Sequence, residues 1–180
     1  MIKPWKHLES RTLADTRIFR LDAHRRRSEE TGREAEYYVL ESGDWVNVVA
    51  VTVDDRIVLV EQYRHGVQRS TLEIPGGMVD PGDASPEEAA RRELLEETGF
   101  EAERWRLIGV VDPNPATHSN RCHTYLATGA TRVQAPRPDE HEEIEVVLEP
   151  VERVPELLRE GRITHALVIA AFHWWALTRG

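Results

Sequence analysis

The chain has 180 residues, which suits one domain or one domain with an extension, and is long enough to bury most of its apolar surface. Its net charge of −9 and its isoelectric point near 5.4 argue against a nucleic-acid-binding protein, because such proteins usually carry a basic face. Cys122 is the only cysteine, so no intrachain disulfide is possible and nothing indicates an oxidising compartment.

Residues 1–44 are predicted to form a small β extension. Two runs, Thr16 to His24 and Glu34 to Leu40, are rich in alternating or β-branched residues, and the polar stretch Arg25 to Arg33 joins them. A sheet of this size is too small to be stable alone. It therefore either folds onto its own domain or pairs with a second copy of the chain. No signal peptide or transit segment is recognisable at the start, which favours the cytoplasm.

The segments that follow predict a β-meander. Trp45 to Val53 and Arg56 to Tyr63 have strand-like composition, with Asp54-Asp55 as the hairpin turn between them. Arg64 comes directly after the second strand and can form a bidentate pair with a phosphate. An arginine at a strand end is as often a surface salt-bridge partner.

The next predicted element is a helix with marked ends. Ser85 is a good N-cap, Pro86 suits the first helical position, and Glu88 completes a capping box. Gly99 supplies the C-terminal stop. The sequence therefore predicts a helix between Ser85 and Gly99.

Three acids of this helix share one face. At about 100° per residue, Glu93, Glu96 and Glu97 lie within about a third of the circumference. Like charges at these spacings repel, and a bound cation removes the repulsion. Carboxylate and carbonyl oxygens suit Mg²⁺ or Mn²⁺, which substrate phosphates often help to coordinate. Taken alone, such a charge run is more often a solvated helix face.

The rest of the chain predicts three more strands and two helices. The strands are Trp105 to Val111, Arg121 to Ala127 and Glu142 to Glu149, and the helices lie near Val154 to Glu160 and Thr164 to Thr178. The longest apolar stretch, Ala166 to Ala176, is too short to cross a bilayer. Strands followed by helices packed on them give an α/β sandwich with a mixed sheet.

Residues 92–100, RELLEETGF, resemble the core of the Nudix box, G-x5-E-x7-R-E-U-x-E-E-x-G-U, where U is an aliphatic residue. Gly77 matches the first glycine of that motif. The sequence departs from it at Asp83, which replaces the first glutamate, and in the eight rather than seven residues between Asp83 and Arg92. Phe100 is aromatic at the last position. These departures leave the role of Asp83 open.

The resemblance implies a Nudix-type α/β/α sandwich with a mixed central sheet over residues 45–180, preceded by the β extension over residues 1–44. It also implies two or three Mg²⁺ or Mn²⁺ ions, with metal ligands from Glu93, Glu96, Glu97 and the carbonyl of Gly76. Arg92 is expected to orient one of these glutamates through an ion pair. The alternative for Gly76 and Gly77 is a plain turn.

Segments outside the box resemble the ADP-ribose and nucleoside-diphosphate-sugar branch of the Nudix hydrolases. Residues 61–64, EQYR, match its Q-Y-R segment, and residues 72–77, LEIPGG, match its E-x-P-x-G entrance. Pro115 lies 16 residues beyond Gly99, where this branch carries a proline. The resemblance implies substrate-binding roles for Arg64, Glu73 and Pro115. In this branch an N-terminal sheet helps to build a homodimer.

The catalytic base is expected in an acidic loop near residues 138–146, which resembles the loop that supplies a glutamate in this branch. Strand alternation turns the side chains of Ile144 and Val146 inward and leaves Glu143 and Glu145 outside, so Glu140 and Glu142, which lie in the loop, are the better candidates. A solvated acidic turn is an equally good interpretation for either one. Glu96 is the rival base.

The sequence as a whole thus predicts a metal-dependent hydrolase of a nucleoside diphosphate derivative. ADP-ribose is the favoured substrate, which would give AMP and ribose 5-phosphate, followed by other nucleoside diphosphate sugars. The alternatives are a Nudix module that binds a nucleotide without hydrolysing it, and a hydrolase of dinucleotides or nucleoside triphosphates. We expect a small-molecule nucleotide substrate and a homodimer, with neither nucleic acid nor membrane as a partner.

Overall fold

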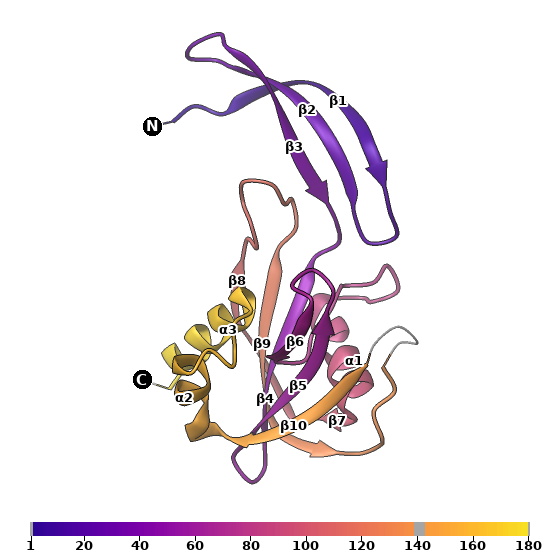
Figure 1. The fold of residues 1–180 in the computed structure, drawn as a ribbon, viewed down its shortest axis with the longest axis vertical. Coiled ribbons are helices and arrows are strands. Elements are labelled where there is room, and N and C mark those ends of the chain that lie inside the picture. The colour runs from indigo at the N-terminus through magenta and orange to yellow at the C-terminus, as the bar shows by residue number, and fades with distance from the viewer. Residues whose placement is uncertain (1, 139–142, 180) are drawn as a thin grey trace. The chain divides into compact units, whose positions relative to one another are not determined.

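The computed structural model describes residues 2–138 and 143–179 (Figure 1). Its elements are β1 (Trp5–Asp15), β2 (Arg20–Ser28), β3 (Glu34–Glu41), β4 (Trp45–Thr52), β5 (Arg56–Arg64), β6 (Arg69–Glu73), α1 (Pro86–Thr98), β7 (Phe100–Glu101), β8 (Arg104–Val111), β9 (Cys122–Arg132), β10 (Ile144–Pro150), η1 (Val151–Arg153), α2 (Val154–Arg159) and α3 (Ala166–Leu177). They form two compact units. One comprises the chain up to Gly43 together with Asp112–Arg121, and the other comprises Asp44–Val111 and the chain from Cys122 onward.

The first unit is built on an antiparallel sheet with the strand order β1-β2-β3. The predicted N-terminal sheet is confirmed, but its strands differ from the expectation. β1 was not predicted, because its sequence, WKHLESRTLAD, lacks an apolar alternation. β2 begins later than expected and continues through Arg25, Arg26 and Arg27, because pairing with both β1 and β3 satisfies its backbone despite the charged side chains.

The second unit contains a mixed sheet, as predicted. Its strand order is β10-β5-β4-β9-β7, with β6 paired to β5 and β8 paired to β9. β4 and β9 run parallel, and the other pairs are antiparallel. β6 and β7 were not predicted, because they are only five and two residues long and owe their conformation to pairing with longer strands.

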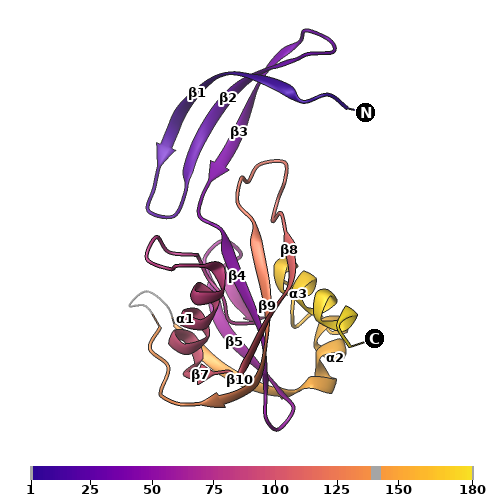
Figure 2. The same ribbon diagram turned by 180° about the vertical axis from the view of Figure 1, so that it is seen from behind.

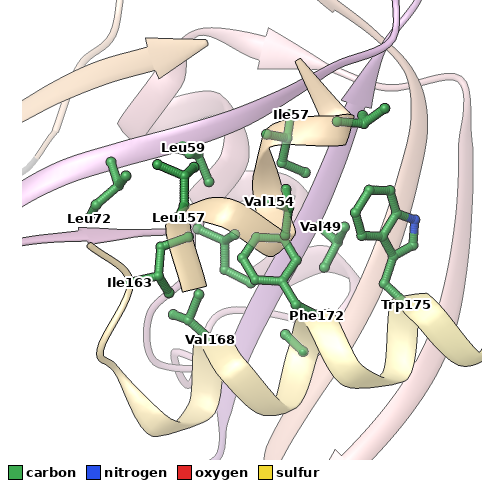
Figure 3. Close-up of a cluster of buried hydrophobic side chains, with 13 residues drawn as sticks. Val49, Ile57, Leu59, Leu72, Val154, Leu157, Ile163, Val168, Phe172 and Trp175 are labelled. Atoms are coloured by element: carbon green, nitrogen blue, oxygen red, sulfur yellow. The ribbon is translucent and has the colours of Figure 1, made fainter. Parts of the chain in front are cut away.

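Two hydrophobic layers cover the two faces of this sheet, which confirms the sandwich. Val48 and Ala50 of β4 pack in one cluster with Leu94 of α1, whereas the intervening Val49 packs in the other cluster with residues of α2 and α3 such as Leu157. Figures 1 and 2 show α1 on one side of β4 and β9, and α2 and α3 on the other. The second cluster is drawn in Figure 3. Burial on both faces explains why β4 is an almost continuous apolar run.

The turn between β4 and β5 is the predicted hairpin. Asp55 adopts a positive φ of 57°, and the hydroxyl of Thr52 donates to the carboxylate of Asp54 at 2.6 Å. The same hydroxyl accepts the backbone N–H of Arg56 at 3.0 Å. Within residues 2–138 and 143–179, no helix is both long and apolar enough to cross a membrane.

Candidate active site

Helix α1 has the ends that its sequence predicts. The Ser85 hydroxyl accepts the Glu88 N–H at 3.2 Å, and the Glu88 carboxylate accepts the N–H of Ala84 at 3.2 Å. Gly99 ends the helix with a φ of 74°, and its N–H donates to the Leu95 carbonyl at 2.8 Å. Both ends are therefore fixed locally, and the helix presents one side to the sheet and its acids to another.

Residues 75–79, the glycine segment before α1, are hydrogen-bonded to β4 and Asp44 as if they formed a further strand. The Val48 N–H donates to the Pro75 carbonyl at 2.8 Å. Gly77 exchanges two bonds with Val46, of 2.9 and 3.1 Å, and the Val79 N–H donates to the Asp44 carbonyl at 2.8 Å. The position of the glycines is thereby set by the central sheet.

The buried acid of α1 joins the helix to this segment. Glu97 is 3% exposed, and its carboxylate accepts the N–H of Gly76 at 3.0 Å. A Cβ added to Gly77 would collide with the carboxylate of Glu93. The glycine backbone and two of the predicted metal ligands therefore lie in direct contact.

Arg92 is the hub of an ion-pair network beside these acids. Its guanidinium donates to both oxygens of Asp83, at 3.1 and 3.0 Å, and to the carbonyl of Met78 at 3.0 Å. It also donates to Glu93 at 2.9 Å and to Glu96 at 3.0 Å. The bonds to Asp83, and then the charges around them, raise the pKa of Arg92 despite its partial burial.

Asp83, whose role the sequence left open, is a member of this network through its two bonds from Arg92. The hydrogen bonds from Arg92 hold the pKa of Asp83 below its ordinary value, so the pair stays ionised near neutral pH. The side chain of Asp83 is 10% exposed. Asp83 has the spacing from Gly77 that the motif requires, and the additional residue lies between Asp83 and the start of α1.

The donor set on α1 and the glycine segment fits a hard divalent cation. It offers carboxylate oxygens of Glu93 and Glu97, whose side chains are mostly buried, and of the more exposed Glu96. Buried carboxylates one helical turn apart repel each other, and a cation between them offsets that cost. The carbonyl of Gly76 adds an oxygen of the same chemical type. The structure thus brings the predicted residues together, while their roles as ligands stay predictions.

Arg64 and Glu73 form a second ion pair in the same unit. Two bonds, of 3.0 and 2.8 Å, join the guanidinium to the carboxylate, and Thr71 donates to Glu73 at 2.6 Å. Burial raises the pKa of Glu73, but the bonds from Arg64 and Thr71 outweigh it, and the net pKa is lowered. Glu73 is 3% exposed and Arg64 is 41% exposed. Thr71 was not anticipated, because a strand threonine carries no distinct sequence signal.

The remaining predicted residues belong to the other compact unit or lie outside the described part of the chain. Pro115 belongs to the unit that contains β1 to β3. Glu140 and Glu142 lie outside the described residues. Asn120, close to Pro115 in the sequence, is 3% exposed and donates to the Gly43 carbonyl at 3.1 Å, which is a structural contact.

Comparison with known proteins identifies what this arrangement is similar to. Residues 41–172 match the sequence profile described as the NUDIX domain. The chain is 32% identical over 133 residues to the methanol dehydrogenase activator of Bacillus methanolicus, covering 73% of this chain and 71% of that protein. It is 29% identical over 177 residues to the ADP-ribose pyrophosphatase of Bacillus subtilis (strain 168), covering 96% and 95%. A crystal structure of an ADP compounds hydrolase superposes with a TM-score of 0.85 at 25% identity, covering 100% and 98%.

Proposed function

Because the chain belongs to the NUDIX domain family, we propose that this pyrophosphohydrolase cleaves the diphosphate linkage of a nucleoside diphosphate derivative, with ADP-ribose as the preferred substrate. The products would be AMP and ribose 5-phosphate. The observation that best supports a metal-dependent site is the bond from the Gly76 N–H to the buried carboxylate of Glu97. The name of the Bacillus subtilis relative, similar to this chain over nearly its whole length, favours ADP-ribose.

Glu93, Glu96, Glu97 and the Gly76 carbonyl would hold Mg²⁺ or Mn²⁺, in two or three ions. The ions would supply positive charge that neutralises the diphosphate and polarises its phosphoryl oxygens. Arg92 orients Glu93 and Glu96, because it donates to both while Asp83 holds its other edge. We assign Arg92 to positioning and not to contact with the substrate.

The Arg64 guanidinium would bind a phosphate of the substrate. Its partly exposed side chain is aligned by buried Glu73, so little side-chain entropy is lost when a phosphate binds. Glu73 would then act on the substrate through Arg64. We keep Pro115 as a substrate-binding prediction from the family resemblance.

A glutamate must take a proton from, or orient, the attacking water. We propose Glu140 or Glu142 for this step, with Glu96 as the rival. Separate Glu140→Gln, Glu142→Gln and Glu96→Gln variants assign it, because removal of the base should lower the rate and abolish the fall in rate toward acid pH that protonation of its carboxylate causes. Near-normal rates in both loop variants would transfer the role to Glu96.

The decisive experiment is a substrate panel with a metal titration. Phosphate release would be measured from ADP-ribose, GDP-mannose, UDP-glucose, NADH, diadenosine polyphosphates and nucleoside triphosphates, with a phosphatase that attacks only the exposed monoester products. We expect the fastest Mg²⁺-dependent release with ADP-ribose. If no compound of the panel releases phosphate but ADP-ribose raises the melting temperature, the protein is a module that binds a nucleotide without hydrolysing it.

Glu97→Gln is the matching variant for the metal site. It removes one ligand charge and should lower turnover by on the order of 100-fold or more, with the circular dichroism spectrum unchanged. Glu87→Gln is its control, since Glu87 lies on the same helix but is 43% exposed and pairs with Arg91. Wild-type turnover by Glu97→Gln at every Mg²⁺ concentration would refute the assignment.

We also propose that the chain forms a homodimer through its N-terminal sheet. This unit exposes large apolar side chains, among them Leu13, Ile18 and Tyr38. Such groups are commonly covered by a partner when they lie together on a surface. Light scattering after size exclusion should give the mass of a dimer, and Leu13→Asp with Ile18→Asp should shift it toward the monomer. A monomeric wild-type protein at micromolar concentration would contradict the proposal.

A further inference from the structure

The N-terminal sheet carries three side chains of types that can bind a metal ion. This sheet belongs to the first compact unit, whereas α1 belongs to the second. Asp22 and His24 are two residues apart on β2, so they lie on the same face of the sheet. Glu41 pairs with Arg20 in register at the end of β3 and belongs to that face too. One ligand atom from each of Asp22, His24 and Glu41 lies within 4.8 Å of the other two.

His24 has the geometry of a metal ligand. Its Nδ1 lies 2.9 Å from the Ser10 hydroxyl, whereas its Nε2 is buried and has no hydrogen-bond partner among the described residues. The side chain is 12% exposed. When Nδ1 carries the proton and donates it to Ser10, the lone pair of Nε2 points away from the serine and is available to a cation.

The gap between His24 and Glu41 also fits an ion. Nε2 lies 3.7 Å from Oε1 of Glu41, which is too long for a hydrogen bond. Two ligands of one tetrahedral ion with bonds of about 2.1 Å are about 3.4 Å apart. A small shift of the partly exposed Glu41 side chain would bring its oxygen to this distance from Nε2.

Asp22 completes the set and already holds a cationic side chain. Its carboxylate accepts from Thr12 at 2.8 Å and from the Arg20 Nε at 3.1 and 3.0 Å. A carboxylate has about four lone-pair positions, so these bonds leave room for a further partner. Arg20 competes with a metal ion for the carboxylate of Asp22. Its side chain is 49% exposed, so it can move aside when an ion binds.

We propose that Asp22, His24 and Glu41 bind a Zn²⁺-class cation, with water completing the coordination. One imidazole nitrogen with two carboxylate oxygens suits Zn²⁺ or Co²⁺, whereas the all-oxygen set on α1 suits Mg²⁺. The ion would link β2 to β3 and stabilise a sheet that is small by itself. The site is independent of the hydrolase reaction.

The test measures Zn²⁺ binding to the full chain by calorimetry in excess Mg²⁺, with Co²⁺ absorption as a spectroscopic readout. We expect one equivalent of Zn²⁺ in the wild type and in Glu97→Gln, and at least tenfold weaker binding in His24→Gln and in Glu41→Gln. Glu9→Gln, on β1 of the same sheet, is the matched control and should bind as the wild type does. Circular dichroism checks the fold of each variant.

Arg20→Gln separates a metal site from a purely structural polar cluster. Removing the competing guanidinium should tighten Zn²⁺ binding, whereas loss of a structural ion pair would not. Unchanged Zn²⁺ affinity in both His24→Gln and Glu41→Gln overturns the proposal. If His24→Gln does not fold, Glu41→Gln decides, because the side chain of Glu41 is one-third exposed and its replacement disturbs little packing.

Discussion

Gly76 and Gly77 lie against different parts of the molecule, so substitutions at the two positions should have different effects on stability and activity. A Cβ at Gly76 would meet the backbone carbonyl of Val46 on β4, whereas a Cβ at Gly77 would meet the end of the flexible Glu93 side chain. A side chain can rotate away, but a central strand cannot. Gly76 is therefore constrained by the core and Gly77 by the site.

Alanine variants test this distinction. Gly77→Ala should keep most of its stability and lose much of its activity, because the Glu93 carboxylate is displaced from its place beside the glycine. Gly76→Ala should lose about 1–3 kcal/mol of unfolding free energy, as overpacked positions do. Urea unfolding and turnover would be measured for both variants. Equal losses of stability would show that the two contacts are not distinct.

The buried Glu73 links stability to pH. Its pKa in the folded chain is lowered, so its ion pair with Arg64 stabilises the fold fully above the pKa of an unfolded glutamate, about 4.3. This contribution is lost as the pH falls below that value and through the folded pKa. Glu73→Gln has no such charge to lose.

The unfolding free energy of wild type minus that of Glu73→Gln should accordingly be positive at pH 7 and shrink as the pH falls below about 4.3. Denaturant unfolding at several pH values measures this difference. Glu87→Gln, on an exposed pair, should show a much flatter difference. If the difference in unfolding free energy between the wild type and Glu73→Gln stays constant across the pH range, the ion pair is not its cause.

At the scale of elements, α1 is the part that the sequence predicts best, because its ends are determined by local bonds. Ser85→Ala should cost about 1 kcal/mol of unfolding free energy, since the Glu88 N–H loses its acceptor. Ser85→Asp supplies another good cap and should retain most of that stability. Thermal unfolding of the three proteins measures it, and an unaffected Ser85→Ala would mean that the helix end is held by tertiary contacts alone.

The strands were predictable to different degrees for a physical reason. β4 and β5 are buried on both faces, so their apolar runs are visible in the sequence. β1 is mostly exposed and β6 is short, so only partner strands determine them. The acids of α1 were found from their spacing, whereas the Arg64–Glu73 pair depends on the cross-strand register of β5 and β6, which sequence spacing does not give.

At the scale of the whole molecule, the sheet of the second unit separates two hydrophobic clusters. Leu94 lies in the cluster beneath α1, and Ile163 lies in the cluster beneath α2 and α3. Side chains in different clusters share no direct packing. Their contributions to stability should therefore be independent.

A double-mutant cycle measures this independence. Leu94→Ala should cost about 2–5 kcal/mol and Ile163→Val about 0.5–1.5 kcal/mol. The double variant should equal their sum within about 0.5 kcal/mol. Urea unfolding gives all three values. A larger coupling energy would show that strain passes through the sheet from one layer to the other.

The bonding of the glycine segment to β4 has a consequence for motion. The amides of Val46, Val48 and Gly77 all donate within this pairing, and β4 is the strand buried between the two layers. Such amides exchange their hydrogens with solvent only when the core opens. We therefore expect these amides to be among the slowest in the chain to exchange, and we expect any movement that admits a substrate or releases a product to occur in other segments.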